Sequence, residues 1–169
     1  LTSEQYLNTL ANIFGDGVRM NVNFAPLPRT DGLRALGAAE TGITPTQVEQ
    51  YQRAATAVAA LAVDRRRREF LFECQPADPG AADRSCAAKF LGTVGRLLYR
   101  QPMSEALLTE AVDKAGETAD QLKDFYAGIS IALEGMLISP MVVLVADRSE
   151  PDPKHPGRER LDAYSVASR

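Results

Sequence analysis

Apolar residues recur at helical spacing in five separate stretches of this sequence, and that period limits the chain to a helical fold. The stretches cover residues 2–15, 44–63, 81–100, 104–115 and 119–138, and a sixth begins at Leu161. Gly15, Pro45 and Gly116 stand at their boundaries, where helices commonly start or stop. The sequence therefore predicts an all-α fold, an irregular bundle of about five to six helices.

Helix-breaking residues divide the chain into three parts. Residues 16–43 carry Pro26, Pro28 and several glycines without a sustained apolar period, so we expect a Pro/Gly-rich irregular connector. Residues 147–158 hold three prolines and charges of both signs, which indicates an exposed loop. We therefore expect an N-terminal helix and connector at 1–43, a helical core at 44–146, and an exposed loop with the start of a helix at 147–169.

The last predicted helix has no stop signal, because residues 161–169 contain neither glycine nor proline. We expect it to continue in a downstream polypeptide of the same precursor, with Leu161, Tyr164 and Val166 completing that partner's core. Cleavage after Arg169 would then yield a heterodimer, and the sequence leaves open whether that cleavage is physiological.

Four consecutive arginines, Arg65–Arg68, directly follow the second predicted helix. The preferred interpretation is a solvated helix end, where cations favour the C-terminal dipole. The alternative is a docking patch for an acidic surface or a phosphate. The next segment, Phe70–Cys74, is apolar without a helical signature, and residues 75–80 indicate a turn.

The charge balance and the hydropathy argue against two classes of partner. With 19 basic and 22 acidic residues the net charge is −3, so no overall field would hold the chain on nucleic acid or on an anionic membrane. No apolar run approaches the roughly 20 residues that span a bilayer, so we expect no transmembrane segment.

Cys74 and Cys86 are the only cysteines, and the eleven residues between them include a Pro-Gly turn that could bring the sulfurs together. We predict a disulfide, which would contribute roughly 2–3 kcal/mol by the loop-entropy argument and would favour an exported protein. The alternative is two independent thiols in a reducing compartment. A zinc site is not expected, because the single histidine, His155, is distant in sequence.

No catalytic motif is recognisable, so we assign no catalytic, cofactor or metal-binding residue to this chain. His155 could ligate a haem or metal held by a partner, but an exposed loop histidine is the preferred interpretation. The four methionines are expected to pack rather than to ligate a haem: Met20, Met103, Met136 and Met141. No Cys-x-x-Cys-His sequence is present, so covalent c-type haem attachment by this chain is not expected.

Four stretches taken together resemble a set of bacterial proteins, abundant in planctomycetes, that combine domains of unknown function with c-type cytochrome domains. Leu1–Gly15 is similar to their N-terminal signature and Cys86–Ser104 to a central segment, in which Gln101 replaces an arginine. Gly128–Pro140 resembles a later helix, and Arg160–Arg169 the start of a larger domain. The matching positions that we take as family-motif residues are Tyr6, Asn8, Arg96, Arg100, Pro102 and Pro140.

The resemblance implies the N-terminal portion of an exported, periplasmic helical protein associated with c-type haem. We accordingly expect a small structural subunit of a processed haem-dependent oxidoreductase, with the haem and the redox centre on the partner chain. Arg96 and Arg100 would be buried, interfacial or solvent-exposed cations. The alternative function is a non-catalytic helical scaffold or binding module, and a self-contained helical enzyme is the least favoured.

Overall fold

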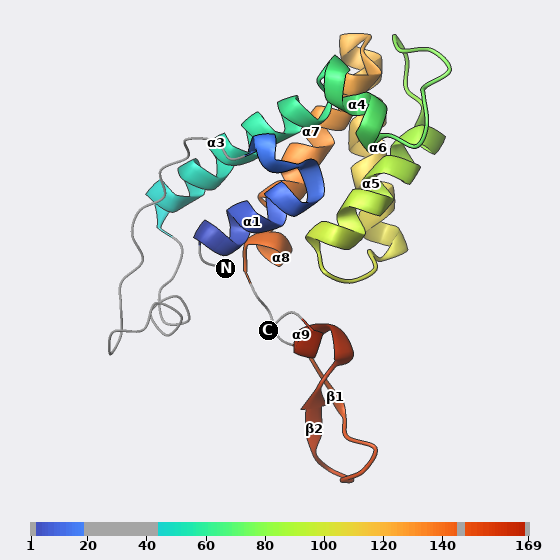
Figure 1. Cartoon of the computed structure of the whole chain (residues 1–169). Coiled ribbons are helices and arrows are strands. Elements are labelled where there is room, and N and C mark those ends of the chain that lie inside the picture. Colours follow the sequence, from blue (N-terminus) through green and yellow to red (C-terminus); the bar gives the residue numbers. More distant parts are fainter. Residues whose placement is uncertain (1–2, 19–43, 145–147, 168–169) are drawn as a thin grey trace.

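The computed structural model describes residues 3–18, 44–144 and 148–167, and their regular secondary structure is helical apart from one small hairpin (Figure 1). The all-α prediction is confirmed. Most of the predicted connector, with Met20, lies outside the described residues. The helices are α1 (Ser3–Phe14), the 3-10 turn η1 (Asp16–Val18), α3 (Pro45–Ala62), α4 (Arg65–Leu71), α5 (Arg84–Leu98), α6 (Glu105–Leu122), α7 (Phe125–Leu137), α8 (Pro140–Val143) and α9 (Ala163–Ala167).

Helix starts follow the local signals in the sequence. Thr44 caps α3 and exchanges hydrogen bonds with Gln47 in a capping box, with Pro45 as the first helical residue. At the other end of α1, Gly15 adopts a φ of 87° and its N–H donates to the Ala11 carbonyl at 2.8 Å. Both ends lie where the sequence predicted them.

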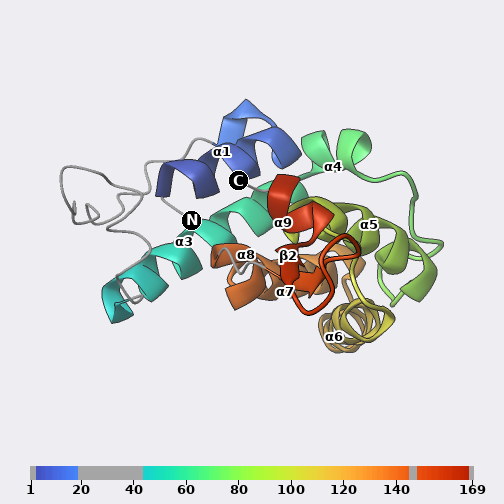
Figure 2. The ribbon, with the colours of Figure 1, turned by 90° about the horizontal axis from the view of Figure 1, so that it is seen from below.

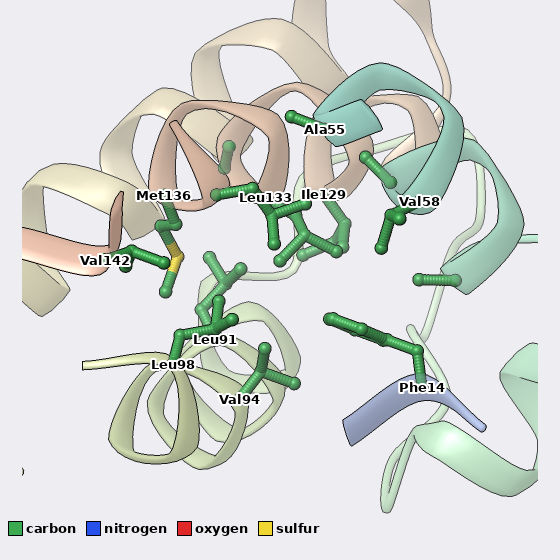
Figure 3. Packing of buried hydrophobic residues seen from close by; sticks show 14 of the residues in the cluster. Phe14, Ala55, Val58, Leu91, Val94, Leu98, Ile129, Leu133, Met136 and Val142 are labelled. Atoms are coloured by element: carbon green, nitrogen blue, oxygen red, sulfur yellow. The ribbon is translucent and has the colours of Figure 1, made fainter. Parts of the chain in front are cut away.

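The core surrounds α7, which packs against α3, α5, α6 and α8. In the view from below, α3 lies between α1 and α7 (Figure 2). Apolar residues from all these helices meet in one cluster (Figure 3). Leu91 and Leu98 from α5, Ile129 and Leu133 from α7, and Val58 from α3 are almost completely buried. Each such side chain contributes about 1.5–3 kcal/mol relative to full exposure.

The boundary between α6 and α7 differs from the prediction. Gly116 does not end a helix; α6 continues through it to Leu122, and Lys123 then adopts a left-handed φ of 55°. Asp124 starts α7 by accepting hydrogen bonds from the backbone of Tyr126 and Ala127 at 2.8 and 3.1 Å. A buried glycine costs α6 about 1 kcal/mol of helix propensity, and tertiary packing outweighs that cost.

The arginine run also differs from the preferred interpretation. Asp64 accepts a hydrogen bond from the Arg66 N–H at 3.0 Å and caps a new helix, α4, which extends to Leu71. Arg65–Arg68 therefore occupy the start of α4 and not the end of α3, and Phe70 and Leu71 are helical. The C-terminal-dipole interpretation is wrong for α3, because one capping aspartate starts a second helix directly after the first; of the four arginines, Arg68 lies in the last turn of a helix, that of α4.

The C-terminal segment contains a hairpin that the sequence did not predict. Strand β1 (Ser149–Pro151) pairs antiparallel with β2 (Glu159–Leu161), with Glu150 opposite Arg160. Leu161 therefore ends a strand, and α9 begins two residues later, where Asp162 accepts a hydrogen bond from the Ser165 N–H at 2.6 Å. Three-residue strands are too short to show a period of two. The hairpin projects away from the bundle (Figure 1).

Among the described residues, no helix combines the length and the apolarity needed to cross a bilayer.

Candidate functional site

Three segments that are far apart in the sequence meet at the corner between α7 and α8, residues 137–142, which we call the α7–α8 corner. Tyr6 reaches it from α1, is completely buried, and donates from its hydroxyl to the Leu137 carbonyl at 3.3 Å. Its ring packs edge-on against Tyr51, with ring centroids 4.9 Å apart. Burial, assisted by the nearby Tyr51, raises the pKa of Tyr6, so the phenol stays neutral and can donate.

The second segment is the end of α5. Arg100 follows the helix with a left-handed φ of 57°, and its guanidinium donates to the Val142 carbonyl at 3.1 Å. Partial burial lowers the pKa of Arg100. The adjacent Tyr99 is buried, and burial raises its pKa while the interaction with the Ser139 side chain opposes that change. The adjacent residues Tyr99 and Arg100 therefore both contact the corner.

The third segment is the start of α8, which forms the corner with the end of α7. Pro140 is the first residue of α8, a position at which its missing N–H costs no helical hydrogen bond. The Ser139 carbonyl accepts from the N–H groups of Val142 and Val143 at 2.8 and 3.0 Å. The Ser-Pro pair is a helix-start signal from which the short helix α8 could have been predicted.

A small cavity of about 210 Å³ lies beside this corner. Pro102 and Met103 from the α5–α6 loop line it together with Met141 from α8 and Arg148. Met103 also packs over α5, because a side chain added at Gly95 would overlap its sulfur. Met136 is buried in the core.

The remaining family-motif residues are not part of this arrangement. Asn8 and Arg96 are exposed on α1 and α5, and within the described part of the chain no hydrogen bond or ion pair joins them to the corner. Of the two alternatives for the arginines, Arg96 is solvent-exposed and Arg100 is half-buried. The motif thus separates into residues that hold the corner and residues that face solvent.

The predicted disulfide is confirmed: Cys74 and Cys86 are bonded. It ties the loop after α4 to the first turn of α5, where Asp83 caps the helix by accepting from the Cys86 N–H at 2.9 Å. Backbone hydrogen bonds, chiefly from Cys86, lower the pKa of Asp83. Next to the bridge, the rings of Phe72 and Phe90 stack with centroids 3.9 Å apart.

His155 lies exposed in the hairpin loop, as its preferred interpretation predicted. Its Nδ1 is 2.7 Å from Oδ2 of Asp152, and this hydrogen bond lowers the pKa of Asp152. In the described ranges, no group of three or more histidine, cysteine, aspartate or glutamate side chains is placed to hold a metal ion.

Two contacts of the arginine run were missed from sequence. Arg67 donates to the Phe14 carbonyl at 3.0 Å, and the Arg68 guanidinium lies over the Tyr126 ring, 3.9 Å from its centroid. Both contacts depend on where α4 starts, because its first residue sets the face on which each arginine lies. The signal that could have revealed them is Asp64 as an N-cap.

Comparison with known proteins gives a family match over residues 1–64, a range that includes α1 and α3. No curated protein and no solved structure matches the chain. The first 64 residues are similar to the family described as PSD3: Protein of unknown function (DUF1587).

Proposed function

We propose that this chain is the small structural subunit of an exported, c-type-haem-associated oxidoreductase, with the haem and the redox centre on a partner chain derived from the same precursor. The haem association, the periplasmic location and the partner come from the resemblance of four sequence stretches to bacterial proteins with cytochrome domains. The chain itself would supply architecture and not catalysis.

The structural role is supported by the hydrogen bonds that two family-motif residues make at the α7–α8 corner. Tyr6 and Arg100 both donate to backbone carbonyls, those of Leu137 and Val142. Such hydrogen bonds satisfy carbonyls at the end of one helix and within the next, and so fix the direction in which the chain leaves the bundle. Export is supported by the disulfide, since such bonds persist in oxidising compartments.

The test is a visible absorption spectrum of the complex purified from its native source, together with the intact masses of its chains after denaturation. A Soret band and a second, heavier chain that carries the haem are expected. A colourless preparation containing a single chain of 18.3 kDa would refute the proposal.

A variant separates the structural role from a catalytic one. Arg100→Gln removes the cation that holds the Val142 carbonyl and should lower the free energy of unfolding by about 1.5–3 kcal/mol. Turnover per haem in the assembled complex should stay unchanged. Lost turnover in a complex of normal stability and composition would contradict the architectural role.

The second candidate is a non-catalytic helical scaffold or binding module. It is favoured by the exposed apolar side chains of α9, where Tyr164 and Val166 are 49% and 61% exposed. The same spectrum discriminates the two candidates, because a scaffold without a haem partner shows no Soret band.

A further inference from the structure

A second concave surface lies near the first turn of α5, at the opposite end of that helix from the α7–α8 corner, between α4 and the loop that the disulfide closes. We call it the α4 pocket; its volume is about 440 Å³. Its floor is apolar: Phe72, Cys74 and Tyr126 are half-buried and Pro76 is buried. The Phe72 ring stacks on Phe90 and meets Tyr126 edge-on at 5.6 Å, so the floor is supported from below by the core.

The rim of the α4 pocket carries two arginines. Arg65 and Arg68 are three residues apart on α4 and therefore project from one face of it. Arg68 is held over the Tyr126 ring, 3.9 Å from its centroid. Neither arginine pairs with a carboxylate of the described residues, and Glu69 is the single carboxylate in the lining. The rim thus offers two cations that the fold does not neutralise.

The side chains of helix α4 are mostly exposed to solvent. None of its residues is buried, and Phe70 is 88% exposed. It is fixed to the bundle through Arg67, which donates to the Phe14 carbonyl, and through the disulfide that follows it. These two attachments position the pocket rim before any ligand arrives, which lowers the entropic cost of binding.

We propose that the α4 pocket binds an acidic peptide segment of a partner protein. A carboxylate of the segment would pair with Arg65 and Arg68, and a neighbouring apolar side chain would lie on the floor formed by Phe72 and Tyr126. Arginine and aromatic residues are the types that dominate binding energy at protein interfaces. A free phosphate would use the two cations but leave the apolar floor unoccupied, so the lining as a whole favours a peptide. This site goes beyond the proposed structural role.

The experiment titrates the full chain into a fluorescently labelled, end-blocked pentapeptide, Glu-Glu-Phe-Glu-Glu, and follows anisotropy. Arg65→Gln is the test variant and Arg66→Gln the matched control, since both residues are exposed on the same helix and both changes remove one positive charge. Of these two arginines, Arg65 lines the pocket and Arg66 does not. Thermal unfolding checks that both variants keep the fold, which the exposure of both side chains favours.

We expect saturable binding that Arg65→Gln weakens about tenfold, as for one charge-assisted contact, while Arg66→Gln weakens it less than about twofold. Replacing the central phenylalanine of the peptide by alanine should also weaken binding. Equal losses in the two variants would indicate diffuse charge attraction and overturn the proposal. Absence of saturable binding, or competition by inorganic phosphate with no dependence on the phenylalanine, would overturn it as well.

Discussion

Two glycines on α7 provide a test of how closely α6 and α7 pack. A Cβ added at Gly128 would overlap the carbonyl oxygen of Ala115 and lie 2.9 Å from the backbone nitrogen of Ala119. A Cβ added at Gly135 would meet nothing within 4 Å. The substitutions Gly128→Ala and Gly135→Ala are chemically identical and lie on one helix, so a difference between them reports packing alone.

The expected effects have opposite signs. Overpacking costs up to about 3 kcal/mol, and Gly128→Ala should approach that value because the obstacle is backbone that a rotamer change cannot remove. Alanine recovers about 1 kcal/mol of helix propensity, which leaves a net loss of about 2 kcal/mol. For a chain of this size, that loss lowers Tm by about 4–8 °C. Gly135→Ala has no packing cost and keeps only this gain in helix propensity, so it should stabilise by about 1 kcal/mol.

Urea unfolding followed by circular dichroism measures both values, with unchanged m-values showing that only stability has altered. Comparable stability of the two variants, or a stabilised Gly128→Ala, would refute the close approach of α6 and α7 on which the core description rests.

Three further predictions concern single contacts. Tyr6→Phe removes the donor to the Leu137 carbonyl and should lower the free energy of unfolding by about 1 kcal/mol in urea; no loss would mean that the hydroxyl makes no net contribution. Reduction with dithiothreitol should cost about 3 kcal/mol, an effect absent in a Cys74→Ala/Cys86→Ala double variant. The pKa of Asp83 is lower in the folded state than in the unfolded chain. Its N-cap therefore stabilises the fold fully above the ordinary aspartate pKa of about 4, and this stabilisation is lost as the pH falls through the folded-state pKa. Asp83→Asn keeps an N-cap side chain but should make the free energy of unfolding less dependent on pH between about pH 2 and 7. If the variant shows the same pH dependence as the original chain, carboxyl groups other than Asp83 cause it.

The sequence by itself determined the parts of the fold that depend on neighbouring residues. Helical apolar spacing, the Thr44-Pro45 start of α3 and the stop at Gly15 act within one or two turns, so they can be recognised without knowing what each helix packs against. The disulfide was predicted from a similarly local pattern, two cysteines twelve positions apart with a turn between them, but the sequence left two independent thiols open and the structure shows the bond.

Local signals failed where they competed with packing or were too short to show a pattern. Gly116 predicted a helix end, yet burial in α6 outweighed its low propensity and moved the break to Lys123. The strands β1 and β2 have three residues each, too few to show an alternating apolar pattern, so the sequence predicts a loop where the structure has a hairpin.

Only the tertiary structure decided which distant residues meet. Tyr6 and Leu137 are 131 positions apart, and their hydrogen bond exists because α1 packs against α3 and α5 in a position that brings Tyr6 to the end of α7. The four residues 65–68 are all arginine, yet their surroundings differ. Arg67 donates to a carbonyl of α1, Arg68 stacks on Tyr126 and Arg66 faces solvent. The physical reason is that a helix assigns successive residues to faces about 100° apart, and what each face meets depends on the packing of the whole chain.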